Sequence, residues 1–140
     1  MPIRDFPFIS LYPGHPPNVW LPINITNPHT GLCVSTYGLI DTGACSCAIP
    51  GFIAQNIGHD IRAGRKKPGF GADGDFDGWE HQIEIDILSQ NGTVLHKINA
   101  GPTQVIERLP IVLLGVDRFL NDFHLQVHYP NRMFSITCPS

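Results

Sequence analysis

Prolines and glycines interrupt this chain so often that it cannot be built from long helices. Its 140 residues include 13 prolines and 14 glycines, and both residue types are unfavourable inside helices. Between these interruptions, apolar and polar residues alternate, most regularly over residues 79–88, where three isoleucines lie on one side and two acidic residues on the other. Such alternation is typical of a strand with one buried face. We therefore predict a mostly β protein.

Short apolar runs, separated by turn residues, predict the other strands. Together with residues 79–88, the expected strands cover residues 19–25, 32–40, 93–100, 111–114, 123–129 and 132–138. Two short helices are also expected. Pro50 would open the first, which Gly58 would end. Asp117 would cap the second, which would run to Phe123.

The length of the chain suits one domain. Residues 1–18 contain five prolines and are expected to form an N-terminal arm or irregular edge. The single domain would then cover residues 19–140. Within it, residues 62–78 contain five glycines, which is too many for a regular element and suits a hairpin or loop.

The charge of the chain gives no sign of a nucleic-acid or membrane partner. Its formal net charge is −3 and its isoelectric point is about 6.1, so no basic surface is indicated. No apolar stretch approaches the length of a bilayer span, and the first residues lack the charged start and apolar run of a signal peptide. We therefore expect a cytoplasmic protein whose four cysteines, Cys33, Cys45, Cys47 and Cys138, are reduced and buried.

One carboxylate has a distinctive sequence context. The apolar residues before Asp41 bring it to a tight turn, Asp41-Thr42-Gly43, after which residues 45–50 are expected to be extended again. Well downstream, a second apolar strand ends in Leu114 and Gly115 and is followed by the second expected helix. The triplet alone is modest evidence, since a turn aspartate that caps its own backbone is common.

In these residues the chain resembles the retropepsin-like family of aspartic proteases. In that family an Asp-Thr-Gly-Ala turn pairs with an apolar-apolar-Gly strand that leads into a short helix, and a glycine-rich flap lies between the two motifs. The resemblance extends over residues 19–137. It implies a closed β-barrel with the acid protease fold, one or two short helices, and a homodimer about a two-fold axis. The implied function is an aspartic endopeptidase acting on a peptide or protein substrate without a cofactor.

The same resemblance implies a role for each motif residue. Asp41 of each subunit would be catalytic. Thr42 would hydrogen-bond across the axis, and Gly43 would let the two backbones pass closely. Ala44, Leu114 and Gly115 would support the catalytic loop from behind. The flap would lie over the substrate and would contain Gly69, Phe70, Gly71, Ala72 and Gly74.

A pair of such carboxylates has well-defined chemistry. Two carboxyl groups a few ångströms apart cannot both ionise, so they share a proton and titrate as a unit. The ionised member takes a proton from water while the protonated one polarises the substrate carbonyl. A two-fold axis makes the pair from one kind of chain, because the same surface patch meets itself.

Other functions remain as alternatives. The same fold could bind extended peptides without cutting them, because fold does not guarantee chemistry. Many retropepsins carry an acidic residue where this chain has Cys45, which leaves its substrate contacts open.

A calcium-responsive protein is a third possibility. Asp73, Asp75, Asp77, Gly78 and Glu84 have the spacing of an EF-hand loop. The flanking sequence favours strands over the helices such a loop needs, so no metal is expected there. A second pair, two histidines at positions 124 and 128 of an expected strand, would lie about 13 Å apart and could not share one ion.

Overall fold

The computed structural model describes residues 1–71 and 74–139 and shows a mostly β chain. The strands are β1 (Ile3–Pro7), β2 (Trp20–Thr26), β3 (Cys33–Ile40), β4 (Ala48–Pro50), β5 (Arg65–Lys66), β6 (Gly69–Gly71), β7 (Gly74–Phe76), β8 (Trp79–Leu88), β9 (Val94–Ile106), β10 (Val112–Leu114), β11 (His124–His128) and β12 (Met133–Thr137). The helical elements are α1 (Gly51–Asn56) and two 3-10 turns, η1 (Ile61–Ala63) and η2 (Leu120–Asp122).

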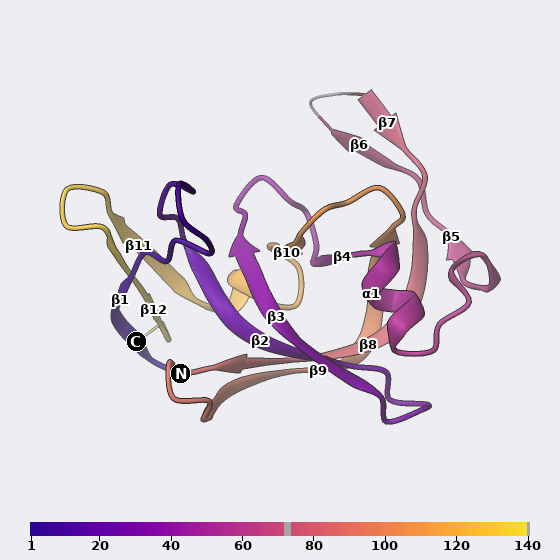
Figure 1. Cartoon of the computed structure of the whole chain (residues 1–140), viewed down its shortest axis with the longest axis horizontal. Helices are drawn as coiled ribbons and strands as arrows, with labels where there is room; N and C mark the ends of the chain where they lie inside the picture. The colour runs from indigo at the N-terminus through magenta and orange to yellow at the C-terminus, as the bar shows by residue number, and fades with distance from the viewer. Residues whose placement is uncertain (72–73, 140) are drawn as a thin grey trace.

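A closed β-barrel forms the body of the molecule (Figure 1). Its strands follow the order β2-β3-β10-β4-β9-β8, and pairing between β2 and β8 closes the ring. Most neighbours are antiparallel, but β10 runs parallel to β3, and β4 runs parallel to β9. The parallel pair β3 and β10 places the ends of two strands side by side, and this arrangement positions the candidate site. The expectation of a mostly β closed barrel is confirmed.

Alternating isoleucines fill the interior of the barrel. Ile23 and Ile25 of β2 pair with Ile87 and Ile85 of β8, and all four side chains are fully buried together with Ile83. Full burial of an isoleucine is worth about 1.5–3 kcal/mol. The alternation over residues 79–88 therefore corresponds to β8, as predicted.

The two termini join in a second sheet of order β1-β12-β11 (Figure 1). Ile3 and Phe6 of β1 are buried, and the Phe6 ring lies 5.3 Å from that of Phe134 in β12. The register of β1 is irregular between Ile3 and Phe6, where Asp5 has φ 51°. Residues 3–7 thus form an irregular edge strand packed on the core, and are not a free arm.

The two predicted helices differ in outcome. Pro50 precedes α1, and Gly58 follows it with φ 91°, as expected. The second prediction is wrong in its start and cap: only η2 forms, and Phe119 caps it instead of Asp117. The backbone N–H of Asp117 instead donates to the carbonyl of Cys45, 2.8 Å away. That contact ties Asp117 to the loop after β3.

The calcium-loop spacing falls on strands. Asp73 lies outside the described residues, while Asp75 is in β7 and Glu84 is in β8. No group of three or more histidine, cysteine, aspartate or glutamate side chains in residues 1–71 and 74–139 is placed to hold a metal ion. Within the same residues, no helix is long and apolar enough to cross a membrane.

Candidate active site

Asp41 lies directly beyond the end of β3, at the start of an exposed loop. Its backbone N–H donates to the carbonyl of Leu114 at 3.0 Å, so the first residue of the loop is anchored to the adjacent strand β10. The carboxylate accepts a hydrogen bond from the N–H of Gly43 at 2.9 Å, and the N–H of Ala44 donates to the Asp41 carbonyl at 3.2 Å. These bonds hold a partly exposed carboxylate in a fixed turn.

The chain after β10 supports this loop from behind. The N–H of Val116 donates to the carbonyl of Ala44 at 3.0 Å. Gly115 is necessary for this approach, because a Cβ there would lie 2.4 Å from the Ser46 carbonyl oxygen and 2.7 Å from that of Ala44. The structure therefore places Asp41, Ala44, Leu114 and Gly115 next to one another, and the roles that the resemblance implies for them stay predictions.

Thr42 and Gly43 are exposed at the apex of the loop. A Cβ on Gly43 would come no closer than 3.2 Å to the nearest atom of the chain, a carboxylate oxygen of Asp41. Their expected contacts across a two-fold axis involve a second copy, so they remain predictions.

A hairpin of β6 and β7 projects from the barrel above β5 and β8 (Figure 1). Its base is closed where the N–H of Lys67 donates to the carbonyl of Gly78 at 2.7 Å. Gly69 pairs with Phe76, whose ring occupies the space a side chain at Gly69 would need. The hairpin contains Gly69, Phe70, Gly71 and Gly74 of the expected flap, while Ala72 lies outside the described residues.

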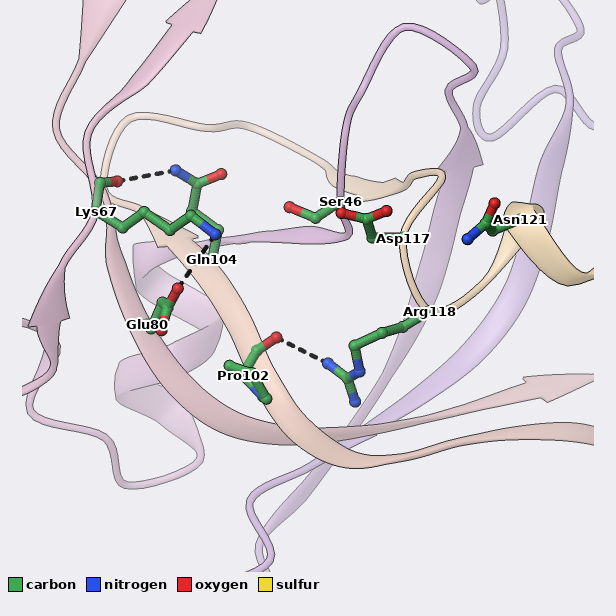
Figure 2. Close-up of a pocket in the computed structure, with 8 residues that line it drawn as sticks. All are labelled: Ser46, Lys67, Glu80, Pro102, Gln104, Asp117, Arg118 and Asn121. Atoms are coloured by element: carbon green, nitrogen blue, oxygen red, sulfur yellow. Dashed lines mark hydrogen bonds and ion pairs between the residues drawn. The ribbon is translucent and has the colours of Figure 1, made fainter.

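A polar cavity of about 390 Å³ lies between the loop after Asp41 and the base of this hairpin (Figure 2). Ser46 and Asp117 form one end, and Lys67, Glu80 and Gln104 form the other. Pro102, Arg118 and Asn121 complete the lining. Sequence reasoning did not single out this group, because its members come from five separate segments of the chain.

Arg118 is a structural residue that sequence reasoning missed. It has φ 67°, which is uncommon outside glycine. Its guanidinium donates to the Pro102 carbonyl at 2.8 Å and to the Thr103 hydroxyl at 3.4 Å, and it also contacts the Asn99 carbonyl. Arg118 thus ties the segment behind the Asp41 loop to β9, and nothing in a single sequence marks it.

The cysteines do not behave as expected. All four are free thiols, but only Cys47 is buried, while Cys33, Cys45 and Cys138 are exposed. Burial raises the pKa of the Cys47 thiol, although a hydrogen bond from Gly115 and the charge of Arg118 oppose the shift. Two residues at alternate positions of one strand would face the same side, but Cys45 is exposed and Cys47 is buried. Both lie before β4, which begins only at Ala48.

Comparison with solved structures identifies the architecture. A retropepsin-like aspartic protease from Rickettsia conorii aligns with a TM-score of 0.62 over 96% of this chain and 98% of that chain, at 17% sequence identity. The chain has the retropepsin-like fold. EIAV protease, in complex with the inhibitor HBY-793, aligns with a TM-score of 0.46 and 16% identity over 80% of this chain and 93% of its own. No family model and no curated protein sequence matches the chain.

Within this retropepsin-like fold, the Asp41 loop offers one carboxylate from one chain. A single carboxylate that also accepts the Gly43 N–H can bind or take a proton, but it cannot act at once as base and acid. The chemistry of a shared proton needs a second carboxyl group close by.

Proposed function

We propose that this protein is an aspartic endopeptidase that acts as a homodimer. The observation that carries the proposal is the Asp41 loop itself. A carboxylate stands at the end of a barrel strand, is fixed by the N–H of Gly43, and is supported by the segment around Gly115. The retropepsin-like fold around it supports the same class of function.

The second carboxylate would come from Asp41 of another copy. The exposure of Thr42 and Gly43 at the loop apex leaves room for such a contact. Two Asp41 side chains facing each other would share one proton. The ionised carboxylate would then accept a proton from water while the other donates to the oxygen of the scissile carbonyl. The proposal requires no metal and no cofactor.

The hairpin of β6 and β7 would close over the substrate as a flap. An extended peptide can pair with backbone groups of such a hairpin, which gives affinity regardless of sequence. The glycine content of residues 69–74 allows the strands to approach the peptide closely. We assign Gly69, Phe70, Gly71, Ala72 and Gly74 to this role as a proposal. Closing of the flap would also exclude bulk water from the reaction.

The decisive experiment replaces the proposed catalytic group. Wild-type protein, Asp41→Asn and the control Asp60→Asn, which changes an exposed aspartate in another loop, are incubated with a peptide library at several pH values. We expect cleavage by the wild type and by Asp60→Asn, inhibition by a pepstatin-type compound, and loss of activity of at least a thousandfold in Asp41→Asn. Peptidase activity that survives in Asp41→Asn would exclude the mechanism.

A non-catalytic peptide-binding module is the second candidate. One observation favours it: the hairpin and the polar cavity are complete within a single chain. Such a protein would bind extended peptides as a monomer and would cleave none of them between acid and neutral pH. Cleavage that depends on Asp41 would exclude this candidate.

A further inference from the structure

The polar cavity lies where an extended peptide would pass. Ser46 follows the Asp41 loop, and Lys67 lies at the base of the proposed flap, so the cavity spans the gap between the two (Figure 2). A peptide held between flap and loop would place one of its side chains at the mouth of this cavity. The chemistry of the lining therefore bears on which side chain fits there.

Three of the four charged groups in the lining already have partners. The ammonium of Lys67 pairs with Glu80 at 3.2 Å. The guanidinium of Arg118 is directed away from the loop, onto oxygens of β9, where it donates to the Pro102 carbonyl at 2.8 Å. A ligand that needed either cation would have to compete with these contacts.

The fourth charged group, the carboxylate of Asp117, has no such partner among residues 1–71 and 74–139. Within the described residues, the carboxylate of Asp117 makes no hydrogen bond or ion pair, and neither the hydroxyl of Ser46 nor the side-chain amide of Asn121 makes a hydrogen bond. Asp117 and Ser46 are bridge partners at the end of the sheet, and their side chains lie side by side in Figure 2. The backbone N–H of Asn121 is bound to the Val116 carbonyl at 2.9 Å. The backbone is thus fixed, while three polar side chains have unused hydrogen-bonding capacity.

We propose that this cavity is a substrate subsite that prefers a lysine or arginine side chain, with Asp117 as the residue that sets the preference. This inference rests on the proposed peptide-binding role of the cleft. The long aliphatic part of such a side chain would cross the cavity, and its charged head would meet the Asp117 carboxylate and the Ser46 hydroxyl. Charge-assisted hydrogen bonds of this kind are stronger than neutral ones. An acidic side chain would instead face an unpaired carboxylate.

The test measures cleavage of peptides that differ at one position. The varied residue is lysine, arginine, norleucine or glutamate, and it is placed at each position of the peptide in turn. At one subsite we expect the wild type to prefer lysine and arginine over norleucine. We expect Asp117→Asn to lower the ratio of kcat/KM for the basic peptides to kcat/KM for the norleucine peptide by about tenfold. Asp117→Lys should favour glutamate. The control Asp122→Asn removes a nearby carboxylate that is not part of the cavity.

Binding measurements separate this inference from the proposed activity. The same peptides, carrying a fluorophore, are titrated into Asp41→Asn with and without Asp117→Asn. If the wild type cleaves nothing but the basic peptides bind more tightly through Asp117, the subsite stands and the protease proposal fails. An equal loss for all peptides in Asp117→Asn, no effect of that change, a preference for glutamate in the wild type, or no binding of any peptide would each overturn the subsite.

Discussion

At the scale of single residues, Arg118 and Gly101 form a pair that stabilises the support of the candidate site. The left-handed backbone of Arg118 is offset by the contacts of its guanidinium with β9. A Cβ at Gly101 would lie 2.4 Å from a guanidinium nitrogen, so an alanine there would displace the guanidinium from its present position. We expect Arg118→Ala to lower the free energy of unfolding by about 1–3 kcal/mol, as measured by urea denaturation.

The matched control for this prediction is Arg108→Ala. Arg108 is exposed and makes no hydrogen bond or ion pair within the described residues, so its removal should change stability by less than about 0.5 kcal/mol. Gly101→Ala should resemble Arg118→Ala, because it displaces the same guanidinium. Equal stability of the Arg118 and Arg108 variants would show that the contacts with β9 contribute nothing.

The candidate site shows which residues a single sequence can indicate. Asp41 could be singled out because its turn and the apolar strand before it are local in sequence, whereas Ala44, Leu114 and Gly115 entered only through the resemblance of their motifs to a family. The roles of Arg118 and Asp117 were not predictable, since they arise from contacts with Pro102 in β9 and with Cys45 after β3. Such contacts join residues that are distant in sequence, and neither spacing nor composition records them.

At the scale of elements, local pattern predicted some segments and failed for others. β8 has the bounds expected from its alternation, since one buried face requires that pattern. β9 runs to Ile106, beyond the expected end at residue 100, because β8 pairs with it through Gly101 and Pro102 and β4 pairs with its last three residues. Glycine and proline usually end a strand, and here tertiary pairing outweighs them. For residues 1–18 the sequence left an arm or an irregular edge open, since the partner of β1, strand β12, is at the other end of the chain.

Two histidines attach the segment before the β6–β7 hairpin to the barrel and should make the stability of that segment depend on pH. His59 and His81 have ring centroids 4.5 Å apart. Their Nε2 atoms donate to the carbonyls of Gln82 at 3.1 Å and Ile61 at 2.7 Å. Burial, and then the charge of His81, lower the pKa of His59, although its hydrogen bond to Gln82 opposes the shift. Protonation of His59 would therefore destabilise the segment.

The direction in which stability changes with pH follows from the lowered pKa of His59. Because the pKa of His59 is lower in the folded state, the unfolded chain binds more protons near pH 6, and stability rises with pH. The stabilisation is complete above the ordinary histidine pKa of about 6.5 and is lost as the pH falls through that value toward the lowered folded pKa. We expect the Tm of the wild type to fall more steeply than that of His59→Gln between pH 7.5 and 5.5. Burial also lowers the pKa of His96, so some slope should persist in both proteins. Identical slopes would contradict the prediction.

At the scale of the whole molecule, the proposed activity requires two copies, because each chain carries one Asp-Thr-Gly turn. We expect specific activity to fall on dilution below the dissociation constant of the dimer. Mixing supplies the sharper test. With equal amounts of wild type and Asp41→Asn, random pairing would place about half of the wild-type chains in mixed dimers with one carboxylate. Activity per wild-type chain should then fall by about half. Asp60→Asn keeps Asp41 and should itself be active, so an equal amount of it should double the total activity and leave the activity per Asp41-bearing chain unchanged. If Asp41→Asn had no effect after subunits had time to exchange, each chain would be acting alone, and a shared proton between two Asp41 side chains could not be the source of activity.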